Sequence, residues 1–413
     1  MILNRIQPVL DPLLRPNQNG FRPGRSTTAH ILALRRVIEG VRSHNQKAII
    51  AFVDFKKAFD SIHRGKMMEI VRKYGVPSKL VDAIDQLYKE TYASVLSPDG
   101  LTEKFEIKAG VLQGDTLAPY LFAIVVDYAM REAIENDEQN LGFQITPRKS
   151  SRHPAITVTD MMFADDIALL SNEISQAHEL LSQVEIEAAK VGLHLNEKKT
   201  ELMAFNYDDP VDVLTMNGNS VKNVLNFIYL GGWMASSEKD YNIRKEIAWS
   251  VCNDMKKIWH SNLSRKFKIR LFRATVESVL LYNSETWTIN KALEKKINGT
   301  YTRMLRMALN VTWKMKWTNE ELYEDLPKVS HTIRERRLRL AGHCVRHEEE
   351  IAHQLILWEP SRGTRSRGRQ PVSFVDTLKR DTGLDDVNEL KTVMMNRSEW
   401  RNYVKIGSSE NST

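Results

Sequence analysis

Residues 161–170 (MMFADDIALL) constrain the fold of this chain more than any other segment, because they place two adjacent aspartates inside an apolar run. Apolar residues on both sides of Asp165 and Asp166 predict two short strands joined by a tight turn at the aspartate pair. Adjacent carboxylates in such surroundings repel each other and lose hydration unless a cation lies between them. The segment therefore predicts a β-hairpin with a cation site at its tip, and a solvated turn is the alternative.

A third aspartate follows another short apolar run. Residues 48–53 (AIIAFV) are typical of a buried central strand, and Asp54 comes directly after them. An aspartate that caps the following helix would give the same pattern. If Asp54, Asp165 and Asp166 converge from rigid elements, they supply the hard oxygen ligands that two Mg²⁺ ions need for phosphoryl transfer.

The remaining patterns predict an α+β domain followed by an all-α one. Periodicity indicates helices at 29–41, 119–134 and 173–191, a strand at 193–205, a hairpin turn at Asn217-Gly218 and a strand that ends at Gly231-Gly232. Beyond about residue 240 the pattern is helical nearly throughout. This order favours an antiparallel sheet with packed helices, followed by a separate helical part.

Composition and charge limit the class of protein. A chain of 413 residues with 42% hydrophobic and 27% charged residues should form two or three domains with real cores, which excludes a single small module and wholesale disorder. The net charge of +7 is uneven, because residues 1–50 hold 8 basic and 2 acidic side chains, 101–200 hold 9 and 16, and 251–300 hold 10 and 4. Basic regions on both sides of an acidic middle are compatible with a nucleic-acid partner.

Cysteine usage and hydropathy bear on location. Two cysteines, Cys252 and Cys344, exclude a disulfide framework and suit a reducing compartment, so we expect an intracellular protein. No apolar run is long enough for a signal-peptide core or a membrane span, so no membrane partner is expected. Low complexity is confined to 361–369 (SRGTRSRGR), which is typical of a flexible basic arm.

Five segments, in order, resemble the palm motifs of reverse transcriptases from non-LTR (LINE-type) retrotransposons: AFVDFKKAFD, GVLQGDTLAPYLF, FADDIAL, GLHLNEKKTEL and FIYLGG. The likeness extends to NQNGFRPGRSTTAH near the start and to RRLRLAGHCVRH at 336–347, so it covers most of the chain. FADD within an apolar hairpin is the most specific motif. The resemblance implies a right-hand polymerase, with partial fingers and palm at 1–205, a primer-grip-like hairpin region at 206–235, a helical thumb at 236–350 and a basic C-terminal extension at 351–413.

The resemblance implies an RNA-directed DNA polymerase that adds deoxynucleotides to a primer 3′-hydroxyl on an RNA template, as in target-primed retrotransposition. Its partners would be an RNA template, a DNA primer and deoxynucleoside triphosphates, and its expected location is the nucleus. Asp54, Asp165, Asp166 and the backbone carbonyl of Phe55 would hold two Mg²⁺ ions, with Mn²⁺ as a substitute. Lys199 would lie near the pyrophosphate leaving group, and the adjacent Lys198 competes for that role.

The resemblance also assigns substrate contacts. Phe59 falls where a bulky ring would exclude a sugar 2′-hydroxyl, and Gln113 and Gly114 match the motif that meets the incoming nucleotide and the template. Nucleic-acid contacts are expected from Arg22 and Arg25 in the fingers, Tyr229 and Gly231 in the primer grip, and Lys266 and Arg270 in the basic thumb. Each assignment has an ordinary alternative: a core phenylalanine, a plain strand-to-turn, a surface arginine or a solvated helix face.

Two tryptophans and the start of the chain leave further questions open. Trp313 and Trp317 lie among basic residues and could stack on bases, but we expect them in the core. Met1 falls where the family's chain is already within the fingers, so we expect the C-terminal part of a longer polyprotein or a truncated copy. A catalytically inactive nucleic-acid-binding remnant is therefore an alternative function, and a metal-dependent nuclease is a third.

Overall fold

The computed structural model describes residues 1–135, 141–150, 152–365, 368 and 371–406. The chain forms two compact units. Unit 1 comprises Met1–Thr27, His44–Leu225 and Pro360–Thr364, and unit 2 comprises Thr28–Ser43, Asn226–Glu359 and Arg365–Thr413. Unit 1 combines a sheet with helices and the described part of unit 2 is helical except for one short hairpin, so the predicted α+β class is confirmed.

Unit 1 is built on a five-stranded sheet in the order β11-β10-β1-β9-β8. Its strands are β1 (Ala48–Val53), β8 (Asp160–Phe163), β9 (Asp166–Ser171), β10 (Glu201–Phe205) and β11 (Lys222–Asn223). Neighbouring strands are antiparallel except for the parallel pair β10 and β11. Small two-stranded pairs are formed by β2 (Tyr92–Ala93) with β5 (Phe105–Glu106), β3 (Leu96–Ser97) with β4 (Gly100–Leu101), and β6 (Phe143–Thr146) with β7 (Ile156–Val158).

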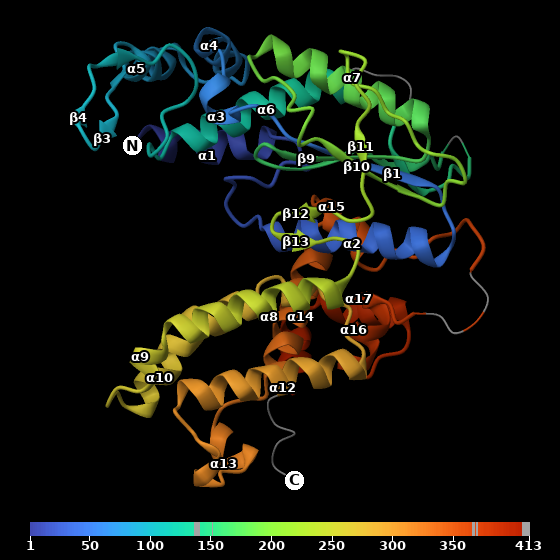
Figure 1. Cartoon of the computed structure of the whole chain (residues 1–413). Helices are drawn as coiled ribbons and strands as arrows, with labels where there is room; N and C mark the ends of the chain where they lie inside the picture. The colour runs from blue at the N-terminus through green and yellow to red at the C-terminus, as the bar shows by residue number, and fades with distance from the viewer. Residues whose placement is uncertain (136–140, 151, 366–367, 369–370, 407–413) are drawn as a thin grey trace. The chain divides into compact units, whose positions relative to one another are not determined.

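The helices of unit 1 are α1 (Ile2–Leu10), η1 (Asp11–Leu13), α3 (Ala58–Ser61), α4 (Arg64–Lys73), α5 (Ser78–Tyr88), α6 (Ala118–Ile134) and α7 (Ile174–Lys190). Figure 1 shows α6 and α7 together over one face of the sheet. Leu121 and Phe122 of α6 and Leu180 and Leu181 of α7 are fully buried in the core that they form with the sheet. Since α6 packs against several elements, it is apolar almost all round.

The sequence locates α6 and α7 closely, but the strand predicted at 193–205 is wrong in its first part. Strand β10 begins only at Glu201, and before it a single bridge pairs Leu195 with Phe55. Before it, the chain turns, because the N–H groups of Lys199 and Thr200 both bond to the carbonyl oxygen of Asn196. The N–H of Asn196 in turn donates to the carbonyl of Asp54 at 2.7 Å, so the irregular segment lies against the end of β1.

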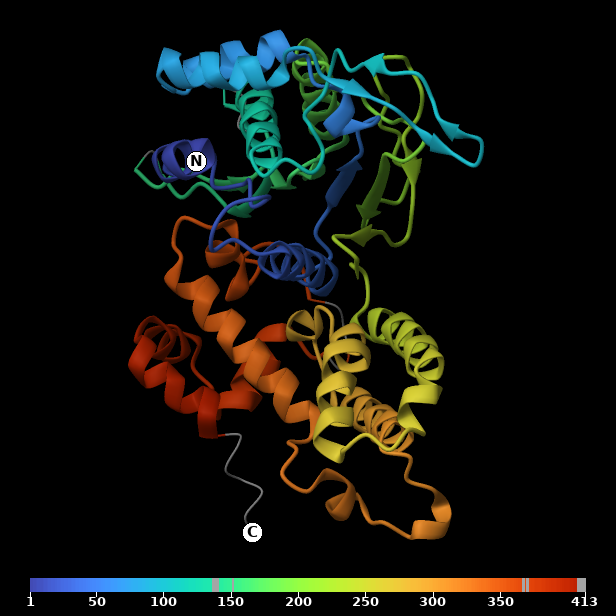
Figure 2. The same ribbon diagram turned by 90° about the vertical axis from the view of Figure 1, so that its left-hand side faces the viewer.

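Unit 2 contains the hairpin of β12 (Ile228–Tyr229) and β13 (Gly232–Trp233) and a set of helices. These are α2 (Thr27–Ser43), α8 (Ser237–Asp254), α9 (Lys256–Trp259), α10 (Arg265–Phe272), η2 (Arg273–Glu277), α11 (Ser278–Leu280), η3 (Ser284–Thr286), α12 (Lys291–Ala308), η4 (Trp313–Met315), α13 (Asn319–Tyr323), α14 (Val329–Arg346), α15 (Ile351–Ile356), α16 (Phe374–Thr382), α17 (Val387–Met395) and α18 (Arg397–Ile406). In Figure 2 the last three helices, in red, lie alongside α14, in orange.

Helix α2 belongs to unit 2 although its sequence lies within the first 43 residues of the chain. Arg35 donates to the Asp240 carboxylate at 2.7 Å, to the hydroxyl of Thr286 at 2.7 Å and to the carbonyl of Trp233 at 2.8 Å. Asp240 also accepts from the indole of Trp287 at 2.8 Å. The guanidinium of Arg35 and the carboxylate of Asp240 are both buried. The structural division is therefore discontinuous, unlike the consecutive domains predicted with boundaries at 205, 235 and 350.

The segment predicted as a basic extension, 351–413, is largely part of the unit 2 fold. Buried apolar side chains anchor its helices, namely Phe374, Leu378, Leu390, Met394 and Trp400. Within the predicted flexible arm, residues 366, 367 and 369 lie outside the described residues, whereas Arg362 accepts at its carbonyl from Gln46 at 2.7 Å. Among the helices that the structure describes, none is both long and apolar enough to cross a bilayer.

Candidate active site

The three aspartates predicted as metal ligands lie at the same end of two neighbouring strands of unit 1. Val53 of β1 pairs with Ile167 of β9, so the antiparallel register places Asp54 opposite Asp166. Phe163 pairs with Asp166 across the β8–β9 hairpin, which leaves Asp165 in the turn. The turn is thus Ala164-Asp165 rather than the predicted Asp165-Asp166, and Ala164 has a positive φ of 58°.

Like charges are concentrated at this edge of the sheet. Desolvation, followed by the negative charges of Asp165 and Asp54, raises the pKa of Asp166 to about 6, although this residue remains open to solvent. Burial raises the pKa of Asp165 as well, and the charge of Asp54 adds to the effect. A divalent cation prefers carboxylate oxygens as ligands, and its charge would offset the repulsion among these aspartates.

The aspartate side chains do not already form a tight ligand cluster. A group of three side chains can hold a metal when their imidazole nitrogens, thiol sulfurs or carboxylate oxygens lie close together. Among the described residues, only His347, Glu349 and Glu350 bring three such atoms within 4.8 Å of one another. The three aspartate carboxylates are therefore more widely spread, as expected for like charges without a counter-ion. Their placement on paired strands fits a metal site that side-chain rotation completes.

Residues 196–200 hold Asp54 from one side. The amide of Asn196 donates to Oδ2 of Asp54 at 2.9 Å, and the N–H of Asp54 donates to the hydroxyl of Thr200 at 3.3 Å. The ammonium of Lys199 lies 3.9 Å from the same Oδ2. The structure thus brings Lys199 to Asp54, while its place near the pyrophosphate stays a prediction. It also adds Asn196 and Thr200, which the sequence did not single out.

A buried amide holds the turn that carries Asp165. Oε1 of Gln18 accepts from the N–H of Ala164 at 2.9 Å and from that of Gly20 at 2.7 Å, while Nε2 donates to the carbonyl of Ala164 at 3.3 Å. Gln18 is completely buried. Gly20 is required here, because a Cβ at that position would lie 2.2 Å from the nitrogen of Ala164. Gln18 therefore fixes the left-handed conformation of the alanine just before the aspartate pair.

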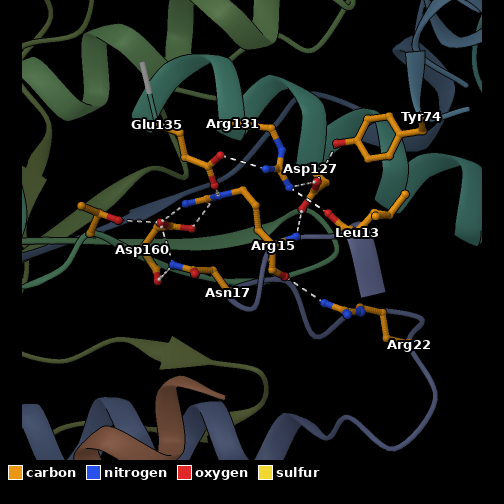
Figure 3. A network of polar contacts seen from close by, with 10 residues as sticks. Leu13, Arg15, Asn17, Arg22, Tyr74, Asp127, Arg131, Glu135 and Asp160 are labelled. Carbon is orange, nitrogen blue, oxygen red and sulfur yellow. Dashed lines mark hydrogen bonds and ion pairs between the residues drawn. The ribbon is translucent and has the colours of Figure 1, made fainter. Parts of the chain in front are cut away.

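The start of β8 is fixed by a buried ionic network (Figure 3). Arg15 forms two hydrogen bonds to the Asp160 carboxylate, at 2.8 and 3.1 Å, and a third to Glu135 at 3.0 Å. The backbone N–H of Arg15 donates to Asp127, whose other oxygen accepts from Tyr74 at 2.6 Å. Since Asp160 is the first residue of the strand that leads to Asp165, this network ties the N-terminal segment to the aspartate hairpin.

The residues predicted to contact the nucleotide lie on helix α3 and on the loop before α6 in unit 1. Phe59 is half-buried and stacks on Phe122, with ring centroids 4.1 Å apart and planes 8° apart. Gln113 is exposed and donates to Asp60 at 2.9 Å. Gly114 has a φ of +95°, with open space where a Cβ would point. Gln113 is thus bonded to Asp60, the residue that follows Phe59 in the sequence. The roles of Phe59, Gln113 and Gly114 remain predictions.

The two arginines predicted to contact the template are both at least half-buried in the structure. Arg22 is buried, donates to Asp11 at 3.0 Å and to the carbonyls of Arg15 and Gln18 at 2.8 and 2.9 Å, so its guanidinium bonds within the fold and its template contact stays a prediction. Arg25 is half-buried, and its template contact stays a prediction. Phe55 is buried and bridges to Leu195, which places its backbone beside the segment that holds Asp54.

The other predicted nucleic-acid contacts lie in unit 2. Tyr229 is buried and Gly231 forms the β12–β13 turn, with a φ of +74° and a carbonyl that accepts from Arg244. Lys266 and Arg270 are both exposed, one turn apart on α10. The basic face of α10 is therefore open to solvent, as a phosphate-binding surface requires.

Residues 1–234 match the family model described as reverse transcriptase (RNA-dependent DNA polymerase). A putative uncharacterized transposon-derived protein of Caenorhabditis elegans is 28% identical over 261 residues, which cover 59% of this chain and 94% of that protein. The Pol polyprotein of the type-1 retrotransposable element R2 of Popillia japonica is 27% identical over 195 residues (47% and 29%). The RNA-directed DNA polymerase from mobile element jockey of Drosophila funebris is 24% identical over 398 residues (90% and 40%).

Among solved structures, a telomerase from Candida albicans in complex with a fragment of telomeric RNA aligns with 84% of this chain and 55% of that chain, with a TM-score of 0.40 and 10% identity. A sheet that presents three aspartates at one end of two neighbouring strands offers the oxygen ligands that metal-dependent phosphoryl transfer requires. Because the family model covers more than half of the residues, this chain belongs to the reverse transcriptase family, and the predicted likeness to non-LTR elements is confirmed. The chain spans less than half the length of the R2 and jockey relatives.

Proposed function

We propose that this chain is an RNA-directed DNA polymerase that uses two Mg²⁺ ions to add deoxynucleotides to a primer 3′-hydroxyl on an RNA template. The observation that carries the proposal is the placement of Asp54 opposite Asp166, beside Asp165, in a member of the reverse transcriptase family. Mn²⁺ would serve as a substitute, because it accepts the same oxygen ligands.

Asp54, Asp165 and Asp166 would hold the ions, which when bound lower the pKa of the primer hydroxyl and offset charge on the triphosphate. The primer 3′-oxygen forms a bond to the α-phosphorus, and the bond from that phosphorus to the bridging oxygen breaks and releases pyrophosphate. Asn196 and Thr200 keep Asp54 oriented, and Gln18 keeps the hairpin turn in place. These residues thus act by positioning the ligands.

Lys199 is suited to assist the leaving group. Its ammonium lies near Asp54 and its side chain is 71% exposed, so a cation bound by Asp54 would displace it without loss of buried contacts. The released ammonium would then be close to the pyrophosphate, where it stabilises negative charge and can donate a proton. Lys199 therefore supports the proposal better than Lys198, which has no such contact with an aspartate among the described residues.

Substrate selection would rest on Phe59 of α3 and on the basic residues of unit 2. Phe59, held by the ring of Phe122, would exclude a 2′-hydroxyl and so favour deoxynucleotides. In unit 2, Lys266 and Arg270 would bind backbone phosphates of the template–primer duplex without reading sequence. The biological setting that we propose is target-primed retrotransposition in the nucleus, with the template, primer and deoxynucleoside triphosphates as partners.

The proposal is tested by primer extension on an RNA template with Mg²⁺ and deoxynucleotides. The wild-type chain should extend the primer, and Asp165→Asn/Asp166→Asn should abolish extension while binding of the primed template is retained. Asp99→Asn, which removes an exposed aspartate of the β3–β4 turn, is the matched control and should leave extension unchanged.

The same assay separates the alternatives. Salt-sensitive duplex binding without extension by the wild-type chain would indicate a nucleic-acid-binding remnant and contradict the polymerase. Cleavage of the template that needs the same aspartates would indicate a metal-dependent nuclease.

A further inference from the structure

An exposed aromatic and basic segment connects α12 to α13. Residues 312–320 are all exposed, and Trp313 is 85%, Met315 51% and Trp317 38% accessible. This finding contradicts the expectation that both tryptophans lie in the core, where Trp259 and Trp287 are found instead. Both views show the segment extending away from the other helices of unit 2 (Figures 1 and 2).

The segment is held in a defined conformation although it is exposed. Arg306 of α12 donates to the carbonyl of Trp317 at 2.9 Å and to the side chain of Asn319 at 3.0 Å. Thr318 and Glu321 form a capping box that begins α13. The N–H groups of Met315 and Lys316 bond back to the carbonyls of Thr312 and Trp313. Hydrogen bonds therefore fix the turn that carries the aromatic rings. Binding of a partner would need to order this segment less than it would a flexible one, which lowers the entropic cost of binding.

Its charge indicates the chemistry of a partner. Lys314 and Lys316 alternate with the apolar side chains, and in the described part of the chain neither ammonium lies within 4.0 Å of a carboxylate oxygen. Alternating rings and cations match the alternating bases and phosphates of an unpaired strand, in which each base exposes a face for stacking. A duplex would offer phosphates to the lysines, but its stacked bases would not reach the indoles.

We propose that the turn formed by Trp313, Lys314, Met315, Lys316 and Trp317 binds single-stranded nucleic acid, with Trp313 stacked on an unpaired base and the lysines on adjacent phosphates. This site is separate in the chain from the polymerase residues of unit 1, and it extends the proposed function by giving unit 2 a contact with the unpaired part of a template or displaced strand.

The direct test is binding of a fluorescent single-stranded oligonucleotide to the full chain in buffer without Mg²⁺. Trp313→Ala should weaken binding by about tenfold, the effect of losing one stacked base, and Trp313→Phe should restore most of it. Leu225→Ala removes an apolar side chain that is 94% exposed in unit 1, so it is the control and should bind as the wild type does.

Two further readouts identify the mode of binding. Indole fluorescence should be quenched by the oligonucleotide in the wild type and less so in Trp313→Phe, because the core tryptophans do not report stacking. Lys314→Gln/Lys316→Gln should reduce the slope of log affinity against log salt by about 1.4, since each phosphate contact with a single strand contributes about 0.7.

Several outcomes would overturn the proposal. Unchanged single-strand affinity in Trp313→Ala would do so, as would an equal loss of affinity for blunt duplex. Trp313-dependent binding to anionic phosphatidylserine vesicles, or Trp313-dependent self-association, without single-strand binding would assign the turn to a lipid surface or a second copy of the chain. The binding assay contains no metal and no deoxynucleoside triphosphate, so it stays informative if primer extension fails. Conversely, primer extension together with unchanged binding by Trp313→Ala would contradict this proposal and leave the polymerase proposal intact.

Discussion

At the scale of single residues, the most informative side chain is Gln18, which bonds to both the N–H and the carbonyl of Ala164. Gln18→Leu keeps the volume but leaves the N–H groups of Ala164 and Gly20 without their acceptor. We expect a loss of stability of about 1–3 kcal/mol, because buried donors without partners are costly. We also expect kcat to fall by about 10- to 100-fold with little change in the KM for nucleotide, since a misplaced aspartate turn affects chemistry more than binding.

Gln7→Leu is the matched control for this variant. Its amide also bonds to a backbone carbonyl of the N-terminal segment, that of Phe21 at 3.4 Å, but it is only half-buried and makes no hydrogen bond to Ala164. Kinetics should therefore be unchanged in Gln7→Leu. A Gln18→Leu protein with reduced stability but wild-type kcat would show that the amide supports the fold alone.

The raised pKa of Asp166 predicts a pH dependence of metal binding. Below a pH of about 6 the carboxyl group takes up a proton that must leave before a cation binds, so Mn²⁺ affinity should fall by up to about tenfold per pH unit between 6 and 5. The metal-free protein should behave in the opposite sense. Since the folded state binds this proton more tightly than the unfolded state does, the contribution of Asp166 to stability increases as the pH falls through 6.

Titration of Mn²⁺ at several pH values, followed by electron paramagnetic resonance, measures the first effect. The Asp166→Asn protein should bind Mn²⁺ weakly and lose most of the pH dependence near 6. Metal affinity in the wild type that is constant between pH 5 and 7 would contradict the assigned role of this carboxylate.

At the scale of elements, the Arg15–Asp160 pair shows how the aspartate hairpin is anchored. Asp160→Leu leaves a buried guanidinium without its main partner, and we expect it to cost about 3–5 kcal/mol. Glu135→Gln removes a half-exposed partner of the same arginine and should cost less than about 1 kcal/mol. Urea unfolding followed by far-UV circular dichroism would compare them, and equal midpoints for the two variants would show that the network does not anchor β8.

The elements that the sequence predicts well are those whose own side chains determine them. The periodicity of α6 and α7 and the apolar run of β1 locate these elements to within one or two residues. The irregular segment before β10 could not be predicted, because its shape depends on bonds from Asn196 and Thr200 to Asp54, which is more than 140 residues away in the chain. The aspartates could be identified because they stand out within apolar segments of the sequence. Gln18 could not, because its role depends on bonds to Ala164, which lies far away in the chain.

The aromatic turn between α12 and α13 shows a second feature that could not be predicted from the sequence, namely which tryptophans are exposed. Tryptophan is buried more often than not, so composition favours the core for Trp313 and Trp317. The side chains that fill the core of unit 2 come instead from Trp259, Trp287 and their neighbours. Which tryptophans remain outside depends on packing that a single sequence does not display.

At the scale of the whole molecule, unit 2 depends on a helix from the first 43 residues. Asp240 is fully buried and accepts from Arg35 of α2, so a fragment of residues 226–413 would bury this carboxylate without its cation. We expect that fragment to be poorly folded alone and to gain helical circular dichroism when a peptide of residues 27–43 is added. A peptide with Arg35→Met should restore much less, and a fragment that folds fully alone would contradict this dependence.

The charge distribution also acquires a structural meaning. The acidic middle of the sequence contains Asp165 and Asp166 at the sheet edge of unit 1, whereas the basic residues Lys266 and Arg270 are exposed in unit 2. The overall charge of +7 therefore combines an acidic cluster, which we propose binds cations, with exposed basic residues, which we propose bind phosphates. The uneven charge of the sequence predicted this separation. It did not predict that α2 would belong to unit 2 while the residues on both sides of it belong to unit 1.

The central claim is that Asp54 and the hairpin aspartates together catalyse nucleotide addition on RNA. Its most direct test is the single-turnover rate at which one deoxynucleotide is added to a primed RNA template in Mg²⁺, with wild-type and Asp54→Asn protein. For Asp54→Asn we expect a loss of about 10³-fold or more, equivalent to about 4 kcal/mol of transition-state stabilisation, with unchanged affinity for the primed template. Incorporation by Asp54→Asn at a rate within tenfold of the wild type would contradict it.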